Sequence, residues 1–181
     1  MLIDAVRKAL EKMDPAYCKL SDLNYQDPDF PKPLNEAKYL ERPFAYEFYH
    51  QLRCLIEKGV VDFGAARVQG EVAKEYQNMP DFNAIPDFII HQPSSTKDNF
   101  AVIEFKLASR KPGDINDDLD KLIKFLRPFL KYDHIVEVLL GSEKELKQRR
   151  DSVQSKVQSL KQPITIVEFD VGSWQANVLY R

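Results

Sequence analysis

Two short apolar runs separated by a polar loop constrain this 181-residue chain more than any other feature. The first run follows Pro86 and reads Asp-Phe-Ile-Ile-His over residues 87–91. The second covers residues 101–108 and reads Ala-Val-Ile-Glu-Phe-Lys-Leu-Ala. Short apolar runs bounded by turn-forming residues are typical of β-strands. The intervening segment is mostly polar, so the sequence predicts a hairpin of two adjacent strands.

Both predicted strands carry charged residues that a buried strand normally excludes. Because side chains alternate across a strand, Glu104 and Lys106 share one face, whereas Phe105 points to the other. If the two strands pair, Asp87 reaches the same place as Glu104. Two carboxylates beside an ammonium group form a site for a hard divalent cation, with a positive charge left to act on a phosphate.

The position of these residues distinguishes them from similar short patterns elsewhere in the chain. Pro-Asp and Glu-x-Lys patterns recur at residues 28–29, 36–38, 80–81 and 145–147. Only Asp87, Glu104 and Lys106 combine a predicted strand start with a predicted strand interior, in the order and separation of a hairpin. The other copies lie in polar lead-in segments or on a heavily charged helix, where such pairs solvate the surface.

The combination resembles the PD-(D/E)XK nuclease superfamily, which includes restriction endonucleases, archaeal Holliday junction resolvases and many repair nucleases. Matched residue by residue, Pro86-Asp87 corresponds to the metal-binding aspartate motif. Glu104-Phe105-Lys106 corresponds to the second acid and the catalytic lysine. The resemblance covers roughly residues 44–141. It implies a restriction endonuclease-like α/β core, in which helices flank a central mixed β-sheet in the order α-β-β-β-α-β.

The resemblance also implies an activity and a cofactor. The expected function is metal-dependent hydrolysis of phosphodiester bonds in nucleic acid, with DNA favoured over RNA. Mg²⁺, for which Mn²⁺ can substitute, is expected on Asp87, Glu104 and the main-chain carbonyl of Phe105. Lys106 is expected to orient or deprotonate the attacking water, or to act as a charged clamp that stabilises the transition state.

A further acid is expected at the metal site, and two residues compete for this role. In the superfamily the helix before the sheet often supplies it, and Glu47, within a predicted amphipathic helix over 44–58, is the residue that matches. Glu71 follows Gly70 in a predicted first strand over 66–76 and is the rival. Each has a plainer interpretation as a solvated surface acid.

Two other functional classes stay open at the level of sequence. A catalytically inactive protein of the same fold could bind nucleic acid or another protein, using its N-terminal helix and aromatic arm. Alternatively, the three charged residues could form a structural network in a general α/β interaction domain, with Glu104 and Lys106 in a surface ion pair and Asp87 capping a turn.

Composition narrows the remaining possibilities. With 44% hydrophobic and 30% charged residues, the chain has ordinary globular composition, and its length favours one domain. No apolar run is long enough to cross a bilayer and the start lacks the shape of a signal peptide, so we expect a cytoplasmic protein. A net charge of −2 argues against nonspecific coating of nucleic acid. Cutting both strands of a duplex usually requires two active sites, which favours a homodimer.

Hydrophobic periodicity divides the expected domain, residues 1–181, into three parts. Residues 1–43 are predicted to form an N-terminal helix and an irregular arm, residues 44–141 the catalytic core, and residues 142–181 a C-terminal helix and strands. Asp114 is the expected N-cap of a helix over 115–130, and Ser142 begins a capping box. The other predicted elements are a helix over 2–13 and strands over 135–140, 163–169 and 174–180.

Overall fold

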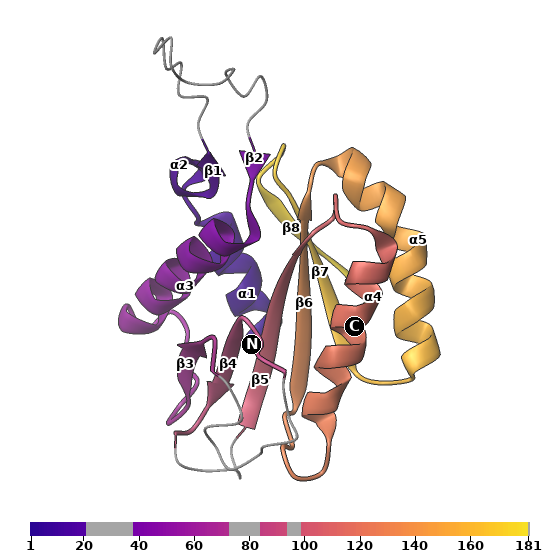
Figure 1. Cartoon of the computed structure of the whole chain (residues 1–181). Helices are drawn as coiled ribbons and strands as arrows, with labels where there is room; N and C mark the ends of the chain where they lie inside the picture. Colours follow the sequence, from indigo (N-terminus) through magenta and orange to yellow (C-terminus); the bar gives the residue numbers. More distant parts are fainter. Residues whose placement is uncertain (21–37, 73–83, 94–98, 181) are drawn as a thin grey trace, which may run out of the picture.

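A six-stranded mixed β-sheet lies between two pairs of helices in the computed structural model (Figure 1). The structure describes residues 1–20, 38–72, 84–93 and 99–180. Helices α1 (Leu2–Glu11) and α3 (Glu41–Glu57) cover one face of the sheet, and helices α4 (Pro112–Leu122) and α5 (Glu143–Leu160) cover the other. The predicted class, an α/β fold with a mixed sheet flanked by helices, is confirmed at this level.

The strands run in sequence order across the sheet, β3-β4-β5-β6-β7-β8. Their bounds are β3 (Arg67–Gly70), β4 (Phe88–His91), β5 (Asn99–Leu107), β6 (His134–Gly141), β7 (Ile164–Asp170) and β8 (Gln175–Tyr180). The pairs β3-β4, β4-β5 and β7-β8 are antiparallel, whereas β5-β6 and β6-β7 are parallel. The parallel connections pass through α4 and α5, as parallel strands require a crossover.

Short elements complete the described chain. They are α2 (Pro15–Cys18), a small antiparallel pair of β1 (Lys19–Leu20) and β2 (Lys38–Tyr39), and the 3-10 helix η2 (Ile123–Leu126). Most of the predicted arm, residues 21–37, lies outside the described residues, as does most of the segment between β3 and β4. No helix within the described ranges has the length and apolarity that a membrane crossing demands.

Two hydrophobic cores cover the two faces of the sheet. Phe44, Phe48 and Leu52 form the predicted apolar stripe of α3. They are fully buried in the core between the sheet and helices α1 and α3. Ile115, Leu119 and Leu122 form the apolar stripe of α4 and are fully buried in the core on the opposite face of the sheet. Seven of the eight residues of β6 are buried, because helices cover both of its faces. This continuous burial explains why β6 reads as an apolar run rather than an alternating one.

Helix α3 begins three residues before the predicted start, and this shift matters for the site. It starts at Glu41, so Pro43 occupies the first turn instead of preceding the helix. Proline is accepted there because the first N–H groups of a helix have no intrahelical acceptor. Glu41 is consequently fixed in the first turn of a rigid helix.

Other boundaries also differ from the sequence-based prediction. Strand β3 ends at Gly70, because Glu71 has a left-handed backbone with φ of 48° that interrupts the extended run. Helix α4 has Lys111 as N-cap and Pro112 at its first position, so the prediction of Asp114 as N-cap is wrong. Helix α4 also ends at Leu122 and passes into η2. The capping box of Ser142 with Glu145 is confirmed at the start of α5.

Candidate active site

Asp87 and strand β5 are joined by two reciprocal hydrogen bonds. Strands β4 and β5 are antiparallel, with Phe88 opposite Ile103, so Asp87 lies beside Glu104. The N–H of Phe105 donates to Oδ2 of Asp87 at 2.7 Å. The N–H of Asp87 donates to Oε2 of Glu104 at 3.1 Å. The two predicted acids therefore meet at one point on neighbouring strands, although 17 positions separate them in sequence.

Lys106 lies two residues beyond Glu104, on the face of β5 that α4 covers. Its Nζ is 2.7 Å from Oδ2 of Asp118 in α4 and 3.8 Å from Oε2 of Glu41 in α3. The ammonium group thus bridges acids from two helices that lie on opposite sides of the sheet. Its neighbour Phe105 points the other way, into the core beneath α3, as the alternation along β5 predicts.

Glu41 is a member of the cluster that the sequence-based prediction missed. Its Oε1 accepts a hydrogen bond from the N–H of Leu107 at 3.1 Å and lies 3.3 Å from Nε of Arg110. The first turn of α3 is thereby fixed to the end of β5, next to Lys106. The available signal was an acid two positions before a proline, which is a common start of a helix.

Helix α4 supplies two more charged groups, Asp118 and Lys121. Nζ of Lys121 is 2.5 Å from Oε1 of Glu104 and 3.6 Å from Oδ1 of Asp118. The sequence alone does not single out either residue, because charged residues on a helix usually lie on its solvated face. Their spacing of three residues places both on one side of the helix, and that side faces β5.

Glu137 is a fifth acid next to the cluster, and it is unusual in having no hydrogen-bond partner among the described residues. It is the direct neighbour of Glu104 in the parallel pairing of β5 with β6. Its side chain is 0% exposed, and neither carboxyl oxygen has a hydrogen-bond partner among the described residues. The signal in the sequence was the same as for Glu104, an acid inside an apolar run. Buried polar groups nearly always have partners, so such an exception calls for an explanation.

Three acids of this cluster have pKa values above their ordinary range. Burial, followed by the charge of Asp87, raises the pKa of Glu104 to about 7. Burial also raises the pKa of Asp87, against the Phe105 N–H and the charges of Lys121 and Lys106. Burial raises the pKa of Glu137 well above its ordinary value. Burial is the largest cause of all three shifts, and it favours the uncharged form of each carboxyl group.

The pKa of Lys106 shifts in the direction that favours its charged form. Burial alone lowers it, but the hydrogen bond to Asp118 and the charge of Glu41 outweigh burial, so the pKa is raised. Lys106 is therefore a fixed ammonium group at neutral pH.

The two residues predicted to be the additional acid are both placed away from these contacts. Glu47 is 8% exposed, and its Oε1 accepts hydrogen bonds from the N–H of Asp14 at 3.1 Å and from Nε2 of Gln51 at 2.8 Å. It links α3 to the turn after α1. The carboxylate of Glu71 is exposed and lies 3.6 Å from Arg42, while its N–H donates to the main-chain oxygen of Asp87 at 2.9 Å.

The donor chemistry of the cluster fits a hard divalent cation. Asp87, Glu104, Glu41 and Asp118 offer carboxylate oxygens, the ligands that Mg²⁺ prefers. Within the described ranges, no group of three or more His, Cys, Asp and Glu side chains is arranged as a metal cage. The ammonium groups of Lys106 and Lys121 contact Asp118 and Glu104 instead.

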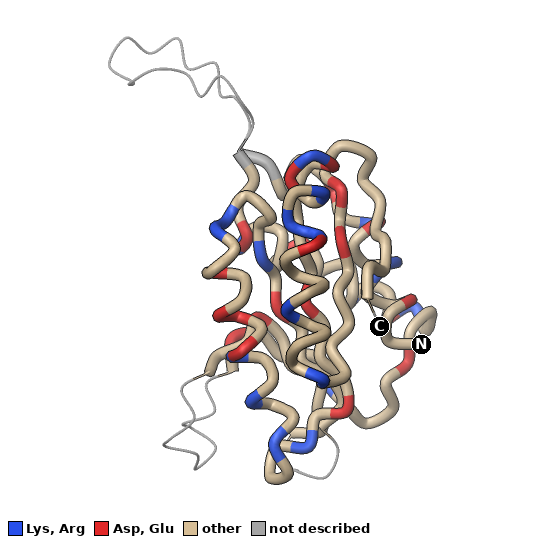
Figure 2. Tube along the Cα trace, turned by 90° about the vertical axis from the view of Figure 1, so that its right-hand side faces the viewer, with Lys and Arg blue, Asp and Glu red and all other residues tan. Residues whose placement is uncertain are grey.

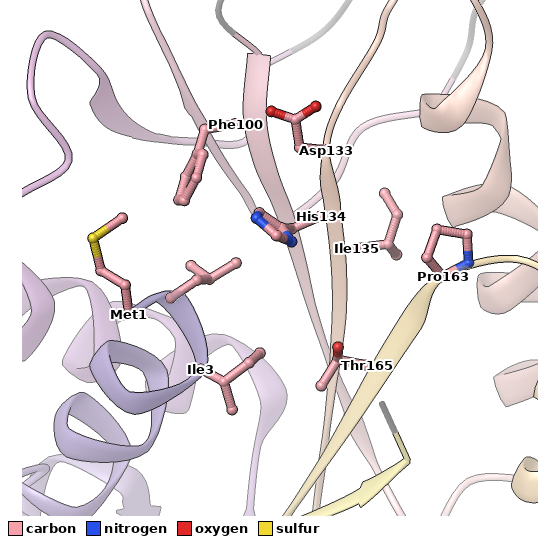
Figure 3. Close-up of a pocket in the computed structure, with 9 residues that line it drawn as sticks. Met1, Ile3, Phe100, Asp133, His134, Ile135, Pro163 and Thr165 are labelled. Atoms are coloured by element: carbon pink, nitrogen blue, oxygen red, sulfur yellow. The ribbon is translucent and has the colours of Figure 1, made fainter.

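The described part of the chain also has charged residues and a cavity outside this cluster. Figure 2 shows acidic and basic residues interspersed along the trace rather than gathered on one basic side. A cavity of about 350 Å³ lies beside the start of α1, where Met1, Phe100 and His134 line it (Figure 3). Phe100 and His134 stand at the beginnings of β5 and β6, away from Glu104 and Lys106 near the other end of β5.

Comparison with known proteins identifies no relative. No family model matches the chain, and no curated protein or solved structure shows significant similarity to it. The geometry of the cluster around Glu104 is therefore the basis for assigning a function.

Proposed function

We propose that this protein is a Mg²⁺-dependent nuclease that hydrolyses phosphodiester bonds, with DNA as its substrate. The observation that carries the proposal is the reciprocal pair of hydrogen bonds between Asp87 and β5. These bonds hold two carboxylates together on rigid strands, with the ammonium group of Lys106 two residues further along β5. Rigid placement of charged groups is what transition-state stabilisation requires.

The order of elements supports a restriction endonuclease-like fold as part of the proposal. Helix α3 precedes three antiparallel strands, β3, β4 and β5, and is followed by α4 and the parallel strand β6. This order is the α-β-β-β-α-β arrangement that the resemblance to PD-(D/E)XK nucleases implies. In the proposal, Glu41 takes the role of the helix-borne acid in place of Glu47, because Glu41 is the α3 acid that contacts Lys106.

Asp87 and Glu104 would hold the cation, with Glu41 and Asp118 as nearby acids and the Phe105 carbonyl as a further ligand. A bound Mg²⁺ supplies an activated water and neutralises charge on the phosphate. The protein's own contribution is to keep the carboxylates in place. The hydrogen bond from the Phe105 N–H to Asp87 does this without using a second side chain.

Lys106 acts in this scheme as a charged clamp on the phosphate. Its raised pKa favours the ammonium form, which attracts the negative charge that develops in the transition state. The same shift argues against Lys106 as the base that deprotonates water. Two copies of the chain would be needed to cut both strands of a duplex at one place, so the proposal includes a homodimer on DNA.

Cleavage assays with matched variants test the proposal. Supercoiled plasmid, linear duplex, single-stranded DNA and RNA are incubated with the protein in Mg²⁺, in Mn²⁺ or in EDTA. We expect metal-dependent cleavage of DNA that falls about a hundredfold or more in Asp87→Asn and in Lys106→Met. Asp117→Asn, an exposed acid on α4, is the matched control and should cleave normally.

Two results would contradict the proposal. One is cleavage that persists in both Asp87→Asn and Lys106→Met. The other is the absence of cleavage on all four substrates together with metal-independent binding of nucleic acid, which would favour a catalytically inactive interaction module.

A further inference from the structure

Lys121 occupies the carboxylate oxygen of Glu104 that a cation would need. Nζ of Lys121 lies 2.5 Å from Oε1 of Glu104, and the N–H of Asp87 lies 3.1 Å from Oε2. Both oxygens of Glu104 are therefore already hydrogen-bonded to the protein. The ammonium group takes one of the two lone pairs of Oε1 and repels a second positive charge, so a cation binds Oε1 more favourably once the ammonium group has moved away.

We propose that Lys121 is a built-in competitor of the divalent cation, holding Glu104 until a cation binds, and that Glu137 accepts the displaced ammonium group. This inference rests on the proposed function, since it concerns the cation expected on Asp87 and Glu104. It goes beyond that function by assigning roles to two residues, Lys121 and Glu137, that the cleavage chemistry does not use.

The two lysines of the cluster differ in a way that singles out Lys121. Lys106 lies on β5 itself and has its own partners, Asp118 and Glu41. Lys121 comes from α4, near the point where that helix passes into η2, and its side chain is 25% exposed. Lys121 can therefore withdraw along its flexible stem without moving a strand, whereas Lys106 stays with the sheet.

Glu137 is placed to accept the ammonium group that leaves Glu104. It is buried with neither oxygen bonded among the described residues, and it is paired in register with Glu104 on the next strand. The charge of Lys121 already acts on it. A carboxyl group accepts hydrogen bonds in either protonation state, so it can receive the ammonium group. An ammonium group moving from Glu104 to Glu137 would give this buried group the partner that it lacks.

Direct measurement of Mn²⁺ binding, without nucleic acid, tests the first part. Isothermal titration calorimetry and the loss of the free Mn²⁺ electron paramagnetic resonance signal would be applied to the full chain and to Lys121→Met. We expect Mn²⁺ to bind Lys121→Met about tenfold to a hundredfold more tightly, because no charged hydrogen bond has to be broken. Lys124→Met, an exposed lysine in η2, is the matched control and should bind as the unmodified chain does.

A double-mutant cycle tests the second part. Glu137→Gln should weaken Mn²⁺ binding in the unmodified chain, because an amide accepts an ammonium group less well than a carboxyl group does. In the Lys121→Met background, Glu137→Gln should have no such effect, because no ammonium group is displaced. An equal loss in both backgrounds would overturn the role of Glu137 as acceptor and indicate that it acts on the cation directly.

Asp87→Asn separates failure of this inference from failure of the proposed function. If Asp87→Asn abolishes Mn²⁺ binding but Lys121→Met binds no more tightly than the unmodified chain, the competitor role is overturned and the proposed cation site survives. If Mn²⁺ binding is absent, or is unaffected by Asp87→Asn, both the inference and the proposed metal site are overturned. Circular dichroism of each variant confirms that it is folded.

Discussion

The carboxylate of Asp87 accepts a hydrogen bond from the main-chain N–H of Phe105 at 2.7 Å, so the acid is aligned by backbone rather than by another side chain. A backbone donor on a central strand has little freedom to move. The alignment of Asp87 therefore depends on the pairing of β4 with β5, and it survives changes in the surrounding charged residues. Substitutions at the site can for this reason be separated into effects on charge and effects on folding.

Asp87→Asn should remove function while leaving the fold intact. The amide oxygen of asparagine can still accept the hydrogen bond from Phe105, but the negative charge that binds a cation is lost. We expect the melting temperature to change by less than about 4 °C, which corresponds to less than about 1 to 2 kcal/mol for a chain of this length. Differential scanning calorimetry without metal measures this, and a large fall would show that the charge itself stabilises the fold.

Stability without metal should decrease as pH rises through neutrality. The pKa of Glu104 is about 7 in the folded protein against 4.5 for the free group, so the folded state binds more protons than the unfolded state between these values. Stability from this group is complete below pH 4.5 and declines until the pH has passed 7. The loss is on the order of 3 kcal/mol.

Urea unfolding in EDTA from pH 5 to pH 8 measures this decline. Glu104→Gln should flatten the dependence, because the group no longer titrates, whereas Asp117→Asn should preserve it. Saturating Mg²⁺ should reverse the decline by stabilising the ionised carboxylates. An unchanged pH dependence in Glu104→Gln would contradict the assigned pKa.

Glu137→Leu should stabilise the protein in the absence of metal. The substitution replaces a buried carboxyl group, which has no hydrogen-bond partner among the described residues, by an apolar side chain, and this relieves a desolvation cost of about 1 to 3 kcal/mol. Glu168 on β7 offers a matched control, since it is equally buried but accepts two hydrogen bonds from Arg150. Glu168→Leu should therefore destabilise. Chemical denaturation of both variants checks the contrast, and a destabilised Glu137→Leu would contradict it.

Glu41 and Glu47, both on α3, should respond in opposite ways. Glu41→Ala removes the acid next to Lys106 and is expected to reduce DNA cleavage at least tenfold. Glu47→Ala removes the acceptor of a part-buried hydrogen bond from the N–H of Asp14, so it should cost about 0.5 to 1.5 kcal/mol of stability and leave the cleavage rate of folded protein unchanged. Single-turnover cleavage and thermal melting on both variants separate the two roles. A loss of cleavage confined to Glu47→Ala would favour Glu47 as the acid.

Local patterns predicted the hairpin and the alternation along β5 correctly. The apolar runs around Asp87 and Glu104, and the strand period of two, depend on neighbouring residues alone. The meeting of Asp87 with Glu104 needed only one further step, the antiparallel pairing of adjacent strands. The amphipathic stripes of α3 and α4 were predictable for the same reason.

The rest of the cluster depends on contacts between distant parts of the chain. Glu137 joins Glu104 through a parallel register that no local pattern specifies, with a helix between the two strands. Asp118 and Lys121 read as ordinary surface charges until α4 is placed against β5. Glu41 was missed because a proline was taken as the boundary of α3, although proline is accepted in the first turn.

Anomalous diffraction from crystals soaked in MnCl₂ tests the central claim most directly. The account predicts a manganese peak within about 2 to 2.5 Å of carboxylate oxygens of both Asp87 and Glu104, with the ammonium group of Lys121 displaced from Glu104. Manganese bound elsewhere on the protein, with Lys121 still hydrogen-bonded to Glu104, would contradict it.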